Sequence, residues 1–141
     1  MEYSKADSKA FVARAAEAQD AGNLEEAHSW YTKAAEAGNL DAMYNLGILS
    51  ETVGSGQAMY NLGVLSADAG DLDCARSWYT KAAEVGNSRA MFDLGLLFVD
   101  AGNFDEAKSW FTKAVEAGNS DAKRELAKLI SRKSWIFKLF S

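Results

Sequence analysis

Glycine recurs at a fixed interval along this 141-residue chain. Seven glycines, at positions 22, 38, 54, 70, 86, 102 and 118, follow one another in steps of 38 − 22 = 16 residues. Glycine takes the left-handed conformation that ends a helix at little cost, and six of the seven precede an Asn or Asp that can cap the next helix. The chain also lacks proline. It is therefore predicted to be all-α, with about eight short helices at residues 4–21, 24–37, 40–53, 57–69, 72–85, 88–101, 104–117 and from 120 onward.

Two helix types alternate with a longer period. ARSWYTKAAEVGN at 75–87 returns as AKSWFTKAVEAGN at 107–119, a step of 107 − 75 = 32 residues. We call helices with this motif SWYTKA-type, and those with AMYNLG or AMFDLG, at 42–47, 58–63 and 90–95, AMYNLG-type. Each AMYNLG-type motif ends in an interior glycine that costs about 1 kcal/mol relative to alanine. A close crossing with a neighbouring helix would explain that cost.

These motifs resemble two repeat families. LGLLFVDAGNFDEAKSWFTKA, residues 94–114, is similar to a tetratricopeptide hairpin, and WYTKAAEAGNLDAMYNLG, residues 30–47, is similar to a Sel1-like junction. The resemblance implies one helical-hairpin solenoid domain over residues 1–141 and a non-catalytic scaffold for a protein or peptide partner. The chain departs from both families in its shorter period and its lack of an inter-repeat proline.

Half a repeat is missing near residues 50–57. The motif AMYNLG at 42 returns at 58, and no SWYTKA-type helix lies between the two copies. Residues 50–57 could stretch back so that the two helices stack in parallel, or a tight turn at 53–56 could make them an antiparallel hairpin. Gly54 and Ser55 favour the hairpin, since they match the glycine and cap of the other turns. Helices could also be exchanged between two chains. A hairpin would swap the layers of all later helices and split any binding surface in two.

Composition and chemistry argue against an enzyme. The net charge of −5 does not suit a nucleic-acid partner, and no nucleophile with a base, metal-ligand cluster or cofactor motif is present. His28, the only histidine, corresponds to Arg76 and Lys108 of the other repeats and is expected to be exposed and idle. Cys74 is expected near a helix start, facing solvent. A single cysteine and no signal-like start indicate a cytoplasmic protein.

In families of this kind the first helix of each repeat lines a concave groove. The resemblance therefore implies a partner-binding set on the AMYNLG-type helices. A second interpretation is that the same residues fill gaps between repeats. The members of the set are Tyr44, Asn45, Ile48, Tyr60, Asn61, Val64, Phe92, Asp93, Leu96 and Val99. The alternative is a structural or engineered repeat protein whose main partner is itself, as a homodimer or a helix-exchanged dimer.

The last eleven residues, SRKSWIFKLFS at 131–141, form a basic and apolar tail. As a continuation of the last helix, the tail is expected to cap the stack through residues that include Trp135, Phe137 and Phe140, because the end of a solenoid exposes apolar surface. A membrane-surface contact is the weaker alternative, since three positive charges and a short apolar patch bind lipid weakly.

Overall fold

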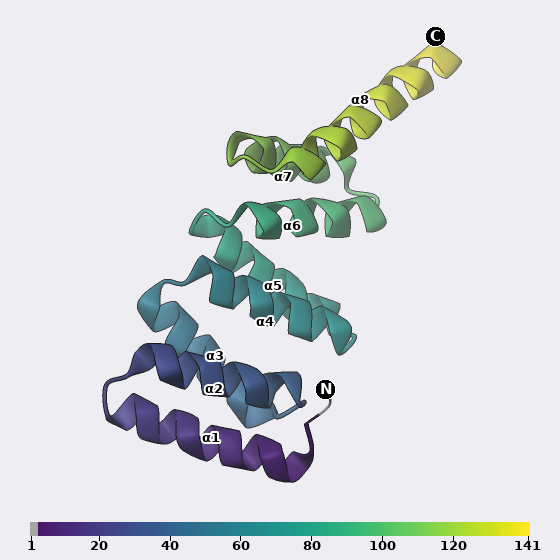
Figure 1. Cartoon of the computed structure of the whole chain (residues 1–141). Coiled ribbons are helices and arrows are strands. Elements are labelled where there is room, and N and C mark those ends of the chain that lie inside the picture. The colour runs from purple at the N-terminus through teal and green to yellow at the C-terminus, as the bar shows by residue number, and fades with distance from the viewer. Residues whose placement is uncertain (1–2) are drawn as a thin grey trace.

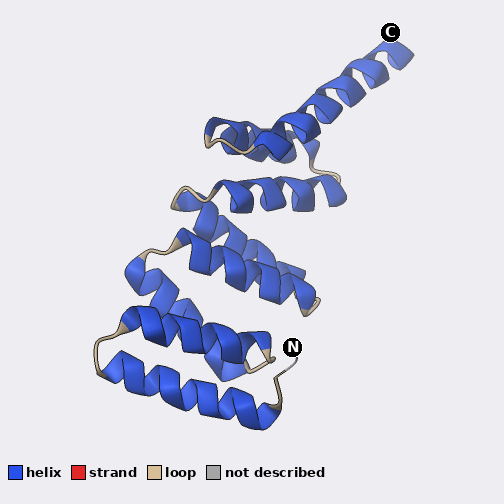
Figure 2. Ribbon diagram, in the orientation of Figure 1, coloured by secondary structure: helices blue, strands red, loops and turns tan. Residues whose placement is uncertain are grey.

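The chain folds into a stack of antiparallel helices in this computed structural model, which describes residues 3–141 apart from the side chains of residues 133–135. The predicted helices are all present (Figure 1). They are α1 (Lys5–Asp20), α2 (Leu24–Glu36), α3 (Leu40–Val53), α4 (Gly56–Asp68), α5 (Leu72–Glu84), α6 (Ser88–Asp100), α7 (Phe104–Glu116) and α8 (Ser120–Phe140). Among the described residues there is no strand (Figure 2).

The turns follow the glycine pattern. All seven periodic glycines have positive φ, between 66° and 96°, the conformation in which a side chain would be strained. The capping residues also act as predicted in most turns: Asn39 Oδ1, for example, accepts a hydrogen bond from the amide of Ala42 at 2.9 Å. Asn103 is the exception, because its side chain makes no cap hydrogen bond.

The interior glycines lie at close helix crossings, as predicted from the loss of helix propensity that each glycine causes. A Cβ atom added to Gly63 would lie 2.4 Å from the ring of Tyr79, and one added to Gly95 would lie 2.4 Å from the ring of Phe111. In each case the aromatic residue comes from the following SWYTKA-type helix. Glycine therefore lets α4 pack closely against α5, and α6 against α7.

The missing half-repeat is closed by a tight turn. Only Gly54 and Ser55 separate α3 from α4, and Ser55 Oγ accepts a hydrogen bond from the amide of Ala58 at 3.2 Å. The chain reverses direction at this turn (Figure 1). The stretched connection to a parallel helix is therefore excluded, and the hairpin prediction for this turn is confirmed.

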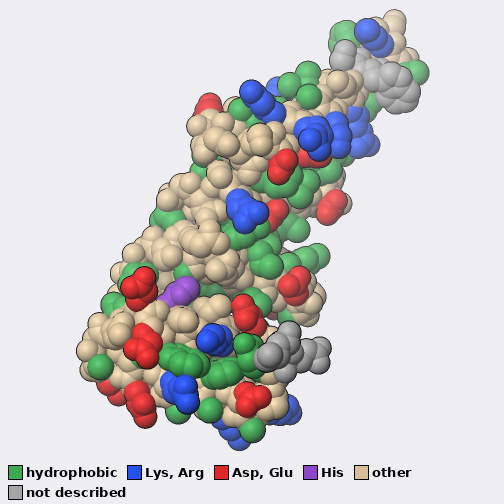
Figure 3. All heavy atoms as spheres, viewed as in Figure 1, with side chains coloured by type: hydrophobic (Ala, Val, Ile, Leu, Met, Phe, Trp, Pro, Cys, Tyr) green, Lys and Arg blue, Asp and Glu red, His purple; other side chains and the backbone are tan. Residues whose placement is uncertain are grey.

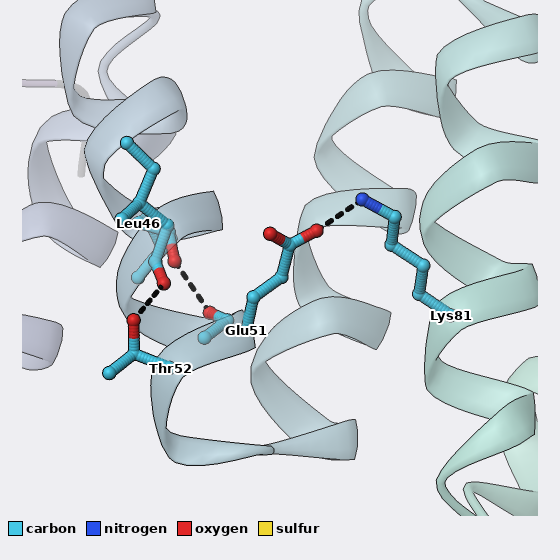
Figure 4. Close-up of polar contacts among 6 residues, drawn as sticks. Leu46, Glu51, Thr52 and Lys81 are labelled. Atoms are coloured by element: carbon cyan, nitrogen blue, oxygen red, sulfur yellow. Dashed lines mark hydrogen bonds and ion pairs between the residues drawn. The ribbon is translucent and has the colours of Figure 1, made fainter.

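The partner of α4 is nevertheless α5 rather than α3. Contact between α3 and α4 is the least extensive of any between consecutive helices, whereas α4 and α5 pack as closely as α1 and α2. Helix α5 also reaches α3 directly, since an added Cβ on Gly47 would lie 2.7 Å from Trp78. The Lys81 ammonium on α5 pairs with the Glu51 carboxylate on α3 (Figure 4). One SWYTKA-type helix thus packs against two AMYNLG-type helices.

These contacts exchange the layers beyond α3, as the hairpin predicts. Asn39 at the start of α3 contacts Ser8 of α1 at 3.4 Å, and α3 in turn contacts α5. In the other row, Tyr60 of α4 bonds to Asp93 of α6, and the Asn119 side chain at the start of α8 donates to the Ser88 carbonyl of α6 at 3.5 Å. The core correspondingly consists of two clusters, and Trp78 packs against both.

Residues 131–140 continue α8 to its end, as expected for a tail that extends the last helix. No glycine or proline follows Gly118, so nothing in the sequence turns the helix back, and its last turns project beyond α7 (Figure 1). Phe137 and Phe140 are 75% and 87% exposed. Within this chain they do not cover the end of the stack as a cap would. The side chain of Trp135 lies outside the described residues.

Candidate functional site: a paired helix face

Two AMYNLG-type helices present neighbouring faces. The hydroxyl of Tyr60 on α4 donates a hydrogen bond to Asp93 Oδ2 on α6 at 2.8 Å, and the guanidinium of Arg89 lies 5.9 Å from the Tyr60 ring centre. This bond joins the predicted residues of both helices into one surface. We call it the α4–α6 face, made of Tyr60, Asn61, Val64, Phe92, Asp93, Leu96 and Val99, all of them half-buried.

Burial shifts the ionisation of this polar pair. It raises the pKa of Tyr60 to about 12, with the bond to Asp93 and the charge of that carboxylate adding to the effect. Burial also raises the pKa of Asp93, although the bond from Tyr60 opposes the shift. The Tyr60 phenol is therefore neutral near pH 7 and donates the hydrogen bond to Asp93. A half-buried carboxylate is a strong acceptor for a donor on a partner.

The inner edges of the α4–α6 face are part of the core. The ring of Tyr60 lies 5.6 Å from that of Tyr79, and the ring of Phe92 lies 5.8 Å from that of Phe111, both in tilted contacts. Val64, Leu96 and Val99 also pack against the core cluster. These residues therefore have both of the roles that the sequence left open, since they fill gaps between helices and still present part of their surface to solvent.

The predicted residues of α3 lie apart from this face. Tyr44 is 71% exposed and Ile48 is 45% exposed, while Asn45 is half-buried. Helix α3 belongs to the row of α1 and α5, so its residues do not continue the line of Tyr60 and Phe92. The ten predicted residues thus form two patches, one on α3 and one on α4 and α6.

Sequence reasoning missed Leu40, which is 77% exposed. It precedes Tyr44 and Ile48 at a spacing of four residues, so the three side chains share one side of α3 and form an apolar stripe. We call it the α3 stripe. The spacing i, i+4, i+8 would have revealed it, but positions 56 and 88 in the sibling helices are Gly and Ser. The comparison between repeats therefore drew attention away from position 40.

Two single residues differ from expectation. His28 is half-buried rather than exposed: its Nε2 is buried and has no hydrogen-bond partner among the described residues, and burial lowers its pKa. Cys74 is also half-buried rather than facing solvent, because Ser66 Oγ of α4 donates to its Sγ at 3.4 Å. Comparison between repeats missed the contact of Cys74 because such a comparison cannot report contacts with a neighbouring helix.

A hollow that the sequence did not predict lies where α8 leaves the body. Its volume is about 860 Å³, and it lies between the start of α7 and the second half of α8. Phe104, Ile130, Ile136 and Phe137 supply apolar lining, and the guanidinium of Arg132 stands 4.5 Å from the centre of the Phe104 ring. We call it the α7–α8 hollow.

The described residues contain no group of three or more His, Cys, Asp or Glu placed to hold a metal ion. Over the same residues, no helix is long and apolar enough to cross a membrane. Hydrophobic side chains show at the surface between α4 and α6, and Lys and Arg gather around the base of α8 (Figure 3). The candidate site is therefore a protein surface that combines hydrophobic and polar side chains.

Fold and surface together define a class: a helical-hairpin repeat protein that presents the faces of stacked helices. Comparison with family profiles agrees. The Sel1 repeat matches residues 14–39, 40–54 and 56–87, more than half of the chain, and a tetratricopeptide repeat matches residues 88–117. The chain belongs to the Sel1 and tetratricopeptide repeat family, whose repeats generally act as non-catalytic scaffolds for protein interaction. The match to 40–54 stops where the half-repeat is missing.

One solved structure supports the same fold. The crystal structure of MamA is similar at a TM-score of 0.50 with 22% sequence identity, covering 83% of this chain and 81% of that chain. A second crystal structure of MamA protein has a TM-score of 0.45 and 16% identity, covering 89% and 87%. No curated protein sequence matches the chain. At such identities the likeness concerns the fold alone.

Proposed function

We propose that this protein is a scaffold that binds an extended peptide or protein segment across the α4–α6 face. The observation that carries the proposal is the hydrogen bond between Tyr60 and Asp93, which holds the two helices in register and leaves a half-buried carboxylate at the junction. Half-exposed rings beside it supply contact area with little side-chain entropy to lose. The layer exchange limits the site to the helices beyond residue 56.

The charge of the body indicates what kind of segment fits. Helix α8 carries six Lys or Arg and two acidic residues, a net charge of +4, so the remaining residues carry −5 − 4 = −9. An acidic surface favours the approach of a positively charged segment. The expected ligand is therefore a peptide with apolar side chains and at least one basic residue, whose donor reaches Asp93.

The test is selection from a library of unstructured 12-residue peptides on the immobilised full chain, followed by titration of an enriched peptide. Replacing Asn61 by arginine should weaken binding at least tenfold, because Asn61 lies on the α4–α6 face. Asn45→Arg is the matched control, since Asn45 occupies the same register on α3. Failure to enrich any peptide, or equal loss in both folded variants, would count against the site.

Self-association is the second candidate, and the α3 stripe favours it. Leu40 and Tyr44 are among the most exposed apolar side chains of the described chain. A second copy covering this stripe would make a homodimer without helix exchange. Light scattering of the full chain against Tyr44→Ser tests this: a dimer that the substitution dissociates supports it, and a monomer at all concentrations excludes it.

A further inference from the structure

We propose that the projecting end of α8 docks onto an anionic lipid surface. Four apolar residues of the last turns, Ile136, Phe137, Leu139 and Phe140, are all exposed. They belong to a helix whose first half is fixed, because Leu126 and Leu129 pack against the core and Arg132 stands over Phe104. The apolar end is therefore held out from the body (Figure 1).

The breadth of the apolar surface favours a lipid interface over a coiled-coil seam. At 100° per residue the four side chains cover an arc of about 160°, with Lys138 on the opposite side. A seam between two copies needs only a narrow stripe of one or two positions per turn. A wide arc at the end of a helix can bury its whole area in the boundary between headgroups and acyl chains.

Charge selects the kind of lipid. Residues 132–138 contain three cations and no acidic residue, and Arg132 lies within the same arc as the apolar residues, about one turn nearer the body. Each Lys or Arg near an anionic membrane strengthens binding by roughly 1 kcal/mol, about fivefold. The cations would therefore meet headgroups while the apolar end enters the boundary, a complementarity that a zwitterionic surface does not offer.

The acidic body does not prevent this approach. It carries a charge of −9 and would be repelled by anionic lipid at close range. Phe140 lies eight residue steps beyond Arg132, about 12 Å along the helix axis, and the screening length at physiological salt is about 8 Å. Since the end projects by more than that length, Lys138 in the last turn contacts the surface while the repulsion of the body is screened.

The experiment is vesicle co-sedimentation of the full chain. Vesicles of phosphatidylcholine with about one third phosphatidylserine should bind it, and pure phosphatidylcholine should bind it much more weakly. Replacing Phe137 and Phe140 together by serine should reduce binding at least tenfold, since each buried aromatic side chain contributes about that factor. The single change Lys138→Gln should reduce it roughly fivefold on the anionic vesicles only.

The matched control replaces Val53 and Leu72, which are exposed apolar residues outside α8, the α3 stripe and the α4–α6 face, by serine, and vesicle binding should not change. Because the changed side chains are exposed, each variant should fold normally, and circular dichroism checks that it does. No binding to anionic vesicles, or equal loss in the control, overturns the proposal. So does a dimer in solution that the Phe137 and Phe140 changes dissociate while vesicle binding stays intact, because a second copy then covers this surface.

Discussion

The indole ring of Trp78 on α5 lies against Gly47 of α3, where a regular repeat would place the aromatic residue of the next SWYTKA-type helix. Tyr79, the adjacent residue, fills the same position over Gly63 of α4. Successive residues of one helix thus close two glycine notches. This arrangement lets the stack continue across a missing half-repeat without leaving α3 uncovered on that side.

We first predict that Trp78→Ala destabilises the protein more than Trp110→Ala. Both residues have the same register, and each ring has the lysine three residues on at 4.6 to 4.7 Å from its centre. Only Trp78 packs against both core clusters. Its loss should cost about 3 kcal/mol or more by urea denaturation, and at least about 1 kcal/mol more than that of Trp110. Equal losses would show that α5 does not join the two halves.

The second prediction concerns Gly95. Alanine would gain about 1 kcal/mol of helix propensity, but its Cβ would lie 2.4 Å from the fully buried Phe111 ring. We expect a net loss of roughly 1–3 kcal/mol from overpacking. In a Phe111→Leu background the same change should cost less, and a double-mutant cycle measures the difference. A stabilised Gly95→Ala single variant would contradict the close crossing.

The third prediction tests the turn in solution. Spin labels at Asp41→Cys and Gln57→Cys, in a Cys74→Ser background, sit near the starts of α3 and α4 at exposed positions. Because the two helices run in opposite directions, the labels should be about 15 Å or more apart, whereas parallel stacking would give about 10 Å. The sample is first shown to be monomeric, since exchange of helices between chains would introduce a second distance.

Sequence predicted the helices well because their signals are local. Gly54 and Ser55 defined the turn at the splice, and the interior Gly63 and Gly95 pointed to close crossings. Trp78 over Gly47 could not be foreseen, since it depends on which helix reaches the vacant side of α3. The direction of α8 was equally inaccessible. The same sequence periodicity is compatible with a last helix that folds over the end of the solenoid and with one that projects from it. The direction of α8 depends on how Ile130 and Arg132 pack against α7, which the sequence does not show.

The candidate site was likewise predictable only in part. Tyr60 and Phe92 occupy equivalent positions in the repeat, which predicts that they lie on one surface, and α4 and α6 do form one face. Register also included Tyr44, which the layer exchange removes from that face. The hydrogen bond between Tyr60 and Asp93 could not be predicted from the sequence. Their separation of 93 − 60 = 33 residues is close to the repeat length, as it is for many residue pairs of neighbouring repeats that form no bond.

The last prediction uses the half-buried His28 as a probe of packing around α2. Burial lowers its pKa below the ordinary value of 6.5, so the unfolded chain binds a proton more readily than the folded one. Stability is then fully present above about pH 6.5 and is lost as the pH falls through the lowered pKa. The melting temperature of the wild type should therefore drop between about pH 7.5 and 5.5. In His28→Gln it should stay nearly constant over that range, because the chain has no other histidine. An equal drop in both proteins would show that His28 is not the group responsible.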